Sequence, residues 1–176
     1  VHALMGENGA GKSTLMKIMT GVYSKDAGTM YLHNPSSGQL EEVDIKSPLA
    51  GQKLGLSMVF QEFNLLENMN IAENIFIGRE PLGTGQTVDR KQLLQKAEEE
   101  LKKVNLDIDP EIEVSKLSCG QKQCVEIAKA LSFHARVVVF DEPTASLSEK
   151  ESQTLFKLIR RLKAEGVCIV DRKSVV

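Results

Sequence analysis

Residues 6–13 have types and a spacing that suit phosphate binding, because they fit the pattern G-x-x-x-x-G-K-[ST]. Glycines let such a loop wrap a triphosphate with its N–H groups pointing inward, and the N-terminus of the following helix adds partial positive charge. The ammonium of Lys12 would reach the β- and γ-phosphates, and the Ser13 hydroxyl would ligate Mg²⁺. The predicted phosphate-binding residues are Gly6, Asn8, Gly9, Ala10, Gly11, Lys12, Ser13 and Thr14.

The alternative is a glycine-rich turn that precedes a lysine by chance. Apolar residues 1–5 predict a strand before the loop, and residues 12–20 predict a short helix that ends before Gly21. Strand, loop and helix in this order favour the phosphate-binding interpretation.

A pair of carboxylates, Asp141 and Glu142, follows the apolar run 137–140, which predicts a parallel strand buried on both faces. Ligands of open α/β sheets bind at the C-terminal ends of strands, so Asp141 should lie beside Ser13 and anchor Mg²⁺ directly or through water. Side chains alternate along a strand, so Glu142 should aim differently and orient or deprotonate an attacking water. The pair alone would suit a strand-ending turn before Pro143, but beside a phosphate loop we favour catalysis.

Residues 117–121 predict a second anion-binding helix terminus. Ser118 and Gly120 stand at the start of a helix, and Gly120 has no side chain to cover the backbone N–H groups. Ser118 with Gln121 three residues later would equally form an ordinary capping box. Without the other motifs, the ordinary cap is the preferred interpretation.

The composition is close to the average of globular proteins, with 41% hydrophobic and 26% charged residues in 176. This length suits one domain, or one domain with a subdomain. The net charge of -2 offers no global attraction for nucleic acid or anionic lipid, so such a partner would need a local patch. No apolar run reaches the roughly 18 residues of a membrane span, and the first residues lack the basic segment, apolar stretch and cleavage site of a leader peptide, so neither a membrane span nor secretion is expected.

The cysteines and aromatic residues argue against a cysteine metal site and against binding of single-stranded nucleic acid by base stacking. Cys119, Cys124 and Cys168 are an odd set without paired metal-ligand spacing, which is typical of reduced thiols in the cytosol. The chain has no Trp, two Tyr and six Phe, so the core must be aliphatic and no aromatic platform can stack single-stranded bases.

Strands and helices are expected to alternate around these motifs, which implies an α/β fold. Further strands are expected at 28–33, 54–60 and 167–170, with the first in a hairpin that turns at 34–38. Capping patterns predict helices that begin near Asp89, Ser118 and Ser148. Residues 62–85 are mixed and Asn-rich, with a short apolar patch at 71–77 and a predicted loop at 83–85.

Taken in order, residues 6–14, Gln61, 117–121, 137–142 and 145–148 resemble the motifs of an ATP-binding cassette (ABC) ATPase, over about residues 1–170. The resemblance implies a P-loop NTPase fold, with a RecA-like parallel core and a helical ABC subdomain, truncated at both ends. It implies ATP and Mg²⁺ as cofactors. The four segments that it implies are an ATPase core at 1–61, a helical signature subdomain at 62–131, a second part of the core at 132–170 and a tail at 171–176.

The resemblance also assigns roles. Gln61 joins the core to the helical subdomain and senses Mg²⁺ and water. The catalytic residues implied are Glu142, Gln61 and Lys12, and the metal ligands Ser13, Gln61 and Asp141. The signature residues implied to touch ATP of a second cassette are Ser118, Cys119, Gly120 and Gln121. Cys119 replaces the more usual glycine, and Ser148 replaces the usual aspartate of the loop 145–148 that crosses the dimer interface.

Residues 1–14, 106–110 and 125–131 most resemble the N-terminal cassette of ribose, galactose and xylose importers. The resemblance implies a subunit that hydrolyses ATP to power import of a simple sugar, peripheral on the cytoplasmic face of the membrane. Its partners would be a second cassette, permease subunits and, indirectly, a periplasmic or extracellular sugar-binding protein, with no nucleic acid. Residues 70–79 would lie near the permease, or equally form a solvated helix with an apolar underside.

Two departures from the family weaken the expected activity of this chain. The adenine-stacking aromatic residue would lie upstream of Val1, and Ser174 stands where the family has a switch histidine. The charged run 171–173 should interrupt a buried strand, so a frayed or non-native tail that does not belong to the fold is expected at 171–176. Weak ATP binding and little hydrolysis follow.

Two other functions stay open. One is a soluble ABC-type ATPase of DNA repair or translation, which shares every nucleotide motif, although the sequence has neither long coiled-coil arms nor basic patches. The other is a fragment without catalytic competence.

Overall fold

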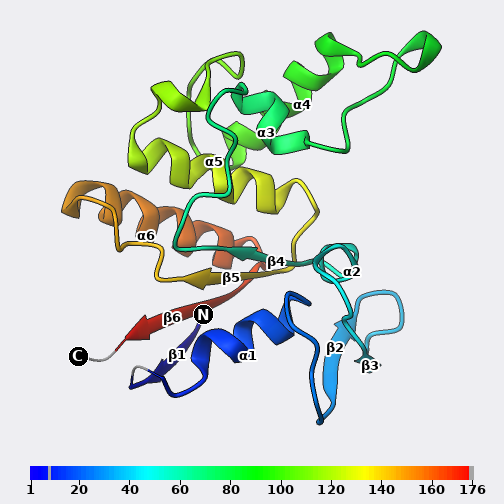
Figure 1. Cartoon of the computed structure of the whole chain (residues 1–176), viewed down its shortest axis with the longest axis vertical. Helices are drawn as coiled ribbons and strands as arrows, with labels where there is room; N and C mark the ends of the chain where they lie inside the picture. Colours follow the sequence, from blue (N-terminus) through cyan, green and yellow to red (C-terminus); the bar gives the residue numbers. More distant parts are fainter. Residues whose placement is uncertain (8, 175–176) are drawn as a thin grey trace.

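The computed structural model describes residues 1–7 and 9–174. Four parallel strands form the central sheet (Figure 1). Their spatial order is β1 (His2–Gly6), β6 (Cys168–Ser174), β5 (Val137–Asp141) and β4 (Leu56–Val59). Because all four run the same way, their C-terminal ends meet at one edge of the sheet, as the α/β prediction requires.

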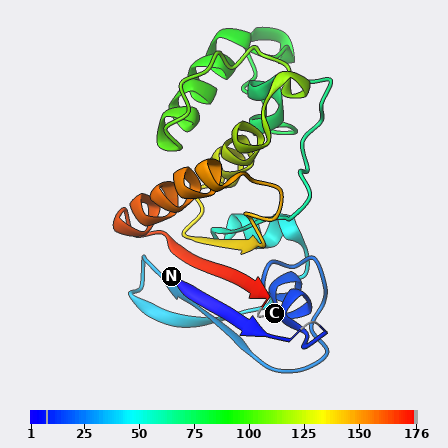
Figure 2. The same ribbon diagram turned by 90° about the vertical axis from the view of Figure 1, so that its left-hand side faces the viewer.

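Helices cover both faces of this sheet. The helices α5 (Cys119–Leu131) and α6 (Glu149–Ala164) lie on one face, and α1 (Lys12–Met19) lies on the other (Figure 1). The inner strand β5 is accordingly apolar without alternation, and Val138, Val139 and Phe140 are fully buried. Figure 2 shows β1 and β6 side by side and pointing the same way.

A small antiparallel hairpin of β2 (Met30–Asn34) and β3 (Gln39–Val43) confirms the expected turn at 34–38. After it comes α2 (Pro48–Lys53), a helix that the sequence analysis did not predict. Its start signal is present: the Ser47 hydroxyl accepts a hydrogen bond from the N–H of Ala50, and Pro48 occupies the first helical position.

The Asn-rich stretch 62–85 contains the short helix α3 (Ile71–Phe76), within the residues 70–79 for which a solvated helix with an apolar underside is one of two interpretations. The helix is largely buried and not solvated. Asn70 and Glu73 form a capping box at its start. Asn74 is buried, and its amide accepts from the N–H of Leu66 and donates to the carbonyls of Leu66 and Asn70. The asparagines therefore fasten the preceding loop to the helix instead of marking a flexible connection.

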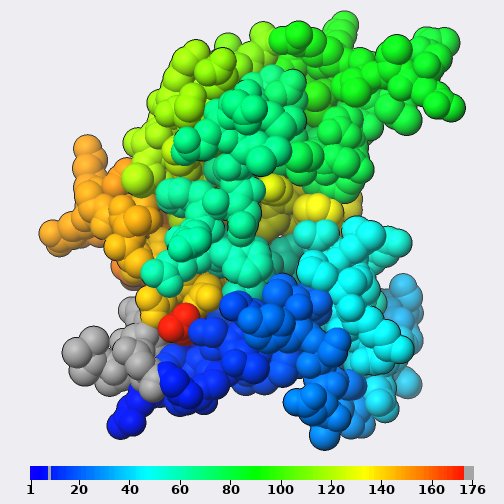
Figure 3. All heavy atoms as spheres, viewed as in Figure 1, coloured from blue at the N-terminus to red at the C-terminus, as the bar shows by residue number. Residues whose placement is uncertain are grey.

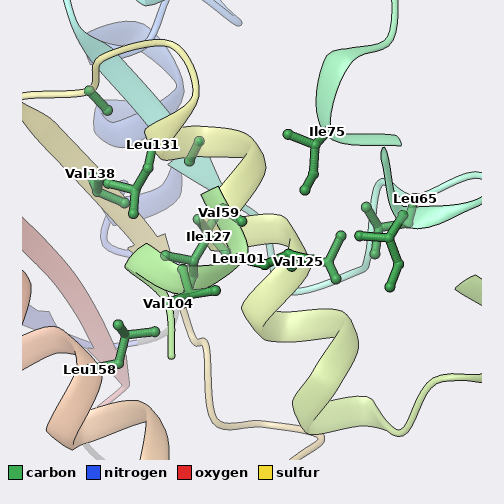
Figure 4. Close-up of a cluster of buried hydrophobic side chains, with 14 of the residues drawn as sticks. Val59, Leu65, Ile75, Leu101, Val104, Val125, Ile127, Leu131, Val138 and Leu158 are labelled. Atoms are coloured by element: carbon green, nitrogen blue, oxygen red, sulfur yellow. The ribbon is translucent and has the colours of Figure 1, made fainter. Parts of the chain in front are cut away.

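The helix α4 (Arg90–Lys103) completes an upper lobe with α3 and α5, seen in green in Figure 3. This lobe and the sheet share one hydrophobic core, in which Val59 and Val138 of the sheet pack in the same cluster as Ile75, Leu101 and Val125 of the helices (Figure 4). Within the described residues, no helix combines the length and apolarity that a membrane span requires.

The prediction of a frayed tail is wrong for residues 171–174, because β6 continues to Ser174. The alternative, that the run 171–176 is non-native, stays a prediction. The strands β1 and β5 pair with β6 on both sides, in a register that sets Gly6 opposite Ser174 and Asp141 opposite Arg172. The charged side chain of Arg172 is paired with carboxylates, which removes the expected cost of a charge in the sheet. Residues 175–176 lie outside the described residues.

Candidate functional site

The loop between β1 and α1 leaves the N-terminus of α1 open. The N-cap residue is Gly11, no described side chain caps the helix, and its first turn contains no acidic residue. Gly9 and Gly11 have φ angles of 86° and 83°, which side chains rarely adopt, while a Cβ at either position would meet nothing within 4 Å. The glycines are therefore needed for the backbone path, and the space over the helix terminus stays accessible.

Among the described residues of this loop, Lys12 is the buried one, with an exposed fraction of 7%. Its ammonium donates hydrogen bonds to the carbonyls of Gly6 at 2.7 Å and Glu7 at 2.8 Å. The positive charge is thus held on the loop itself, at the start of α1. Asn8, which the sequence analysis included in the site, lies outside the described residues.

The acidic strand end lies on the other side of β6 from this loop. Because β1 and β5 flank β6 at the same sheet edge, the backbones at Gly6 and Asp141 are separated by about two strand spacings, or roughly 10 Å. Asp141 shares a cavity of about 510 Å³ with Gln61, whose side chain is exposed at the end of β4. The fold therefore brings Asp141 and Gln61 together, with the phosphate loop alongside.

Asp141 and Glu142 do not diverge as strand alternation predicts. The Arg172 guanidinium donates from Nη1 to Asp141 Oδ1 at 2.5 Å, and its Nη2 lies 3.2 Å from Glu142 Oε1. Glu142 has a φ of 49°, so the chain has already left the strand and the alternation rule ends at Asp141. A non-glycine residue in this conformation costs about 1–2 kcal/mol, and such strain is found at functional sites.

The oxygen donors at this sheet edge suit Mg²⁺. Ser13 offers a hydroxyl, Gln61 an amide oxygen and Asp141 a carboxylate, and hard oxygen ligands are what Mg²⁺ prefers. Among the described residues, no group of three or more His, Cys, Asp or Glu side chains could hold a metal without other donors. A magnesium ion here would therefore need phosphate oxygens and water to complete its shell.

The predicted second helix terminus, at α5, is exposed at Ser118 and Cys119. Ser118 and Gln121 form a complete capping box, so the interpretation of this segment as an ordinary helix cap is confirmed. In addition, the carboxylate of Glu151 on α6 accepts from the Gly120 N–H at 3.0 Å and from the Ser118 hydroxyl at 3.4 Å. A Cβ on Gly120 would come within 2.6 Å of Glu151 Oε1, so this contact requires glycine.

Glu151 is a residue of this site that the sequence analysis recognised only as a cap of α6. Its other oxygen accepts from the N–H and the hydroxyl of Ser148. These bonds, led by the Ser148 hydroxyl, lower the pKa of Glu151 below its usual range. One carboxylate therefore joins the starts of two helices, and the sequence separation of 31 positions between Gly120 and Glu151 explains why no local pattern revealed it.

A second such residue is Glu126, which lines the cavity that contains Asp141 and Gln61. It is 5% exposed and accepts from the Asn64 N–H at 2.5 Å, while Lys129 donates to the Asn64 carbonyl at 3.0 Å. Burial raises the pKa of Glu126. Glu126 and Lys129 of α5 thus hold the backbone three residues after Gln61 by hydrogen bonds. No local pattern in the sequence revealed this contact.

The three cysteines are free thiols, as predicted for reduced cysteines. Burial, with a smaller contribution from the charge of Glu151, raises the pKa of Cys124 to about 11. Cys124 is therefore protonated at neutral pH and a poor nucleophile.

A parallel α/β sheet with a glycine loop at the start of a helix and an acidic residue at the end of a neighbouring strand defines a P-loop nucleotide-binding domain. A family model described as "ABC transporter" matches residues 1–145. The chain belongs to the ABC transporter family of ATPase domains.

Curated relatives agree with this assignment. The chain is 48% identical over 171 residues to a Burkholderia cenocepacia protein named for ATP binding in ribose, galactose and methyl galactoside import. It is 46% identical over 170 residues to the ribose import ATP-binding protein RbsA 1 of Rubrobacter xylanophilus. Each match covers 97% of this chain but only 32% or 33% of the relative, so the chain spans about a third of their length.

Solved structures confirm the fold. A nucleotide-free ATP-binding cassette from an ABC transporter superposes with a TM-score of 0.82 at 27% identity, covering 98% of this chain and 70% of that one. A dimeric ATP-binding cassette in a post-hydrolysis state, bound to ADP and phosphate, has a TM-score of 0.73 at 25% identity, covering 97% and 73%.

Proposed function

We propose that this chain is the ATP-binding and ATP-hydrolysing part of a subunit that powers the import of a simple sugar through a membrane permease. The observation that carries the proposal is the uncapped N-terminus of α1, with the buried ammonium of Lys12 at its start. Backbone N–H groups and one fixed positive charge then face a ligand with several negative charges. The names of the curated relatives support the sugar-import role.

In the proposed site, this chain's own groups perform separate tasks. Lys12 and the loop N–H groups hold the phosphates and stabilise charge on the transferring phosphoryl group. Glu142 accepts a proton from the attacking water, and Gln61 helps to position that water. When bound by Ser13, Gln61 and Asp141, Mg²⁺ would supply positive charge against the phosphate oxygens.

The α5 terminus is proposed to contact ATP that is bound to a second cassette, through Ser118, Cys119, Gly120 and Gln121. A phosphate at this place would approach the Glu151 carboxylate, which already accepts from Gly120 and Ser118. Like charges repel, so Glu151 must turn away from Gly120 before that contact forms. Dimerisation is proposed by analogy with the dimeric cassette of similar fold.

We further propose that the protein acts at the cytoplasmic face of the membrane as a peripheral subunit. Its partners would be permease subunits and, indirectly, a periplasmic or extracellular sugar-binding protein. The short helix α3 is capped by Asn70 and is largely buried, whereas Ile77 and Gly78 directly after it are exposed. Within residues 70–79, the exposed end of the segment is therefore the proposed contact with the permease. Co-purification with a membrane subunit, as opposed to ribosomes or DNA, distinguishes this proposal from a role in translation or DNA repair.

The primary test is ATP affinity of the chain in EDTA, measured with a fluorescent ATP analogue. Lys12→Ala should weaken binding at least tenfold, because a fixed positive charge beside the phosphates is lost. The matched control is Lys53→Ala, which removes an exposed lysine at the end of α2. Equal affinity of the wild type and Lys12→Ala would remove the phosphate-loop assignment.

A further inference from the structure

A cavity of about 600 Å³ lies between α5, α6 and the end of α4. Figure 4 labels two of the residues that line it, Val104 and Leu158, which also belong to the hydrophobic core. Leu106, Leu147 and Leu155 extend this apolar wall. None of the described residues of the phosphate loop lines the cavity. Its volume and its apolar wall are those of a pocket for a small organic molecule.

One polar side chain in the wall of this cavity lacks a partner. Gln123 of α5 lines the cavity and is only 2% exposed. Its Nε2 is buried and has no hydrogen-bond partner among the described residues. A buried donor without an acceptor is unfavourable, and native structures nearly always supply one. An oxygen atom of a ligand in the cavity would supply this acceptor.

The open side of the cavity is positively charged. Lys150 and Lys157 of α6 line it and are exposed, so their ammonium groups lie at its mouth. The other two charged residues of the lining already have partners. The Arg161 guanidinium lies 3.4 Å from the carboxylate of Glu165, and Glu151 accepts from the start of α5. An anionic group of a ligand is therefore favoured at the mouth.

The inner part of the cavity disfavours charge. Cys124 lines it, and burial raises the pKa of this thiol to about 11, so the thiol is neutral. Burial of an ion without a counter-ion costs far more than burial of a neutral group that forms a hydrogen bond. The ligand oxygen that meets Gln123 must therefore be uncharged, as the oxygen of a ketone is.

We propose that this cavity binds a small organic acid, with an apolar body, an uncharged oxygen that accepts from Gln123 and a carboxylate beside Lys150 and Lys157. A keto acid with an aromatic or branched body has all three parts. Because the cavity is separate from the phosphate loop, failure of this proposal would leave the assignment of the ATP site untouched. Ser118 and Gly120 also line the cavity, so an occupant would lie against the α5 terminus that is proposed to contact the second cassette.

The test is a titration of the isotope-labelled chain with two acids, followed by the NMR shifts of the backbone amides. The first acid is 3-benzoylpropionate, and the second is 4-phenylbutyrate, which lacks only the ketone oxygen. Both should shift amides of α5 and α6 around the cavity. The keto acid should bind about fivefold more tightly, because it gains one hydrogen bond to a buried donor. Equal Kd values, or shifts spread over other surfaces, would overturn the proposal.

Two sets of variants separate the roles of the amide and the charges. Gln123→Met keeps the size of the side chain without the donor, so the two acids should then bind equally. Combined Lys150→Gln and Lys157→Gln should weaken both acids about threefold, as expected for exposed charges. Lys163→Gln removes an exposed lysine of the same helix outside the cavity and is the matched control. If Gln123→Met still preferred the keto acid, the assigned donor would be wrong and the proposal would fail.

Circular dichroism and Tm check that the variants fold. If Gln123→Met does not fold, labelling of the wild-type thiols by N-ethylmaleimide at pH 9 replaces it, with Cys119 as the internal control because it is exposed and outside the cavity lining. The keto acid should slow labelling of Cys124 more than 4-phenylbutyrate does and leave Cys119 unchanged. A rate at Cys124 that neither acid changes, or that both change equally, would contradict the proposed site.

Discussion

The helices α1 and α5 both begin with glycine-containing segments, but they differ in whether side chains accept hydrogen bonds from their first N–H groups. At α1, Gly11 occupies the N-cap, and within residues 1–7 and 9–174 no side chain caps the helix. At α5, Ser118 and Gln121 complete a capping box, and the Glu151 carboxylate accepts from Gly120. The same backbone feature is thus left open for an external anion in one place and already supplied with an internal anion in the other.

The comparison teaches that glycine does not by itself make an anion site. Gly11 has a left-handed conformation and open space beside it, whereas Gly120 has helical geometry and is pressed against Glu151. The first glycine is needed for the path of the backbone, and the second for the close approach of a carboxylate. An acidic residue in the neighbouring element decides whether a terminus can receive a phosphate.

The largest expected effect comes from giving α1 the internal anion that α5 has. Gly11→Asp should lower ATP affinity by about a hundredfold or more, because its carboxylate would cap the helix and repel the phosphates. Gly11→Asn, of similar shape without the charge, is the control and should bind more tightly than Gly11→Asp. Binding of the fluorescent ATP analogue measures both, and equal affinity of the two variants would contradict the electrostatic explanation.

A smaller effect is expected from removing the internal anion at α5. The folded pKa of Glu151 lies below its ordinary value of 4.5, so its contribution to stability is present above that pH and is lost as the pH falls through the folded pKa. Glu151→Gln should lower Tm by a few degrees at pH 7 and remove part of the decrease in stability with acid. Thermal unfolding between pH 3 and pH 7 measures this.

Glu149→Gln is the control, since Glu149 lies in the same first turn of α6 and only Glu151 accepts from Gly120. Both changes remove one negative charge from the helix start, so their common effect is the loss of charge near the helix dipole. If the two variants showed the same dependence of Tm on pH, the bridge between α5 and α6 would contribute nothing specific.

The smallest expected effects are changes in stability when Gly11 and Gly120 are each replaced by alanine. Gly11→Ala should destabilise the fold by about 1 kcal/mol, because alanine is strained at a positive φ. Gly120→Ala should change stability little, since a better helix former compensates for the displaced Glu151. Denaturant unfolding of both variants measures the difference, and an equal loss in both would show that backbone conformation is not what separates the two positions.

The local patterns predicted most of the elements. Glycine spacing, capping pairs and apolar periodicity located β1, α1, α5, β5 and α6, because each pattern reflects neighbours within four or five residues. The same approach missed α2, whose six residues are too short for a periodic signal, and gave α3, of the same length, only as one of two interpretations of residues 70–79. It also ended β6 too early, because a charged run resembles a tail unless its ion-pair partners are known.

What the sequence determined by itself is the kind of chemistry: a loop whose backbone needs glycine, a lysine beside it and carboxylates at a strand end. The tertiary structure alone decided how these groups are partnered. It brought Arg172 to Asp141, Glu151 to Gly120 and Glu126 to Asn64, across 31 to 62 residues of sequence. The physical reason is that charge and hydrogen bonding act over a few ångströms in space, and strand register and helix packing set those distances.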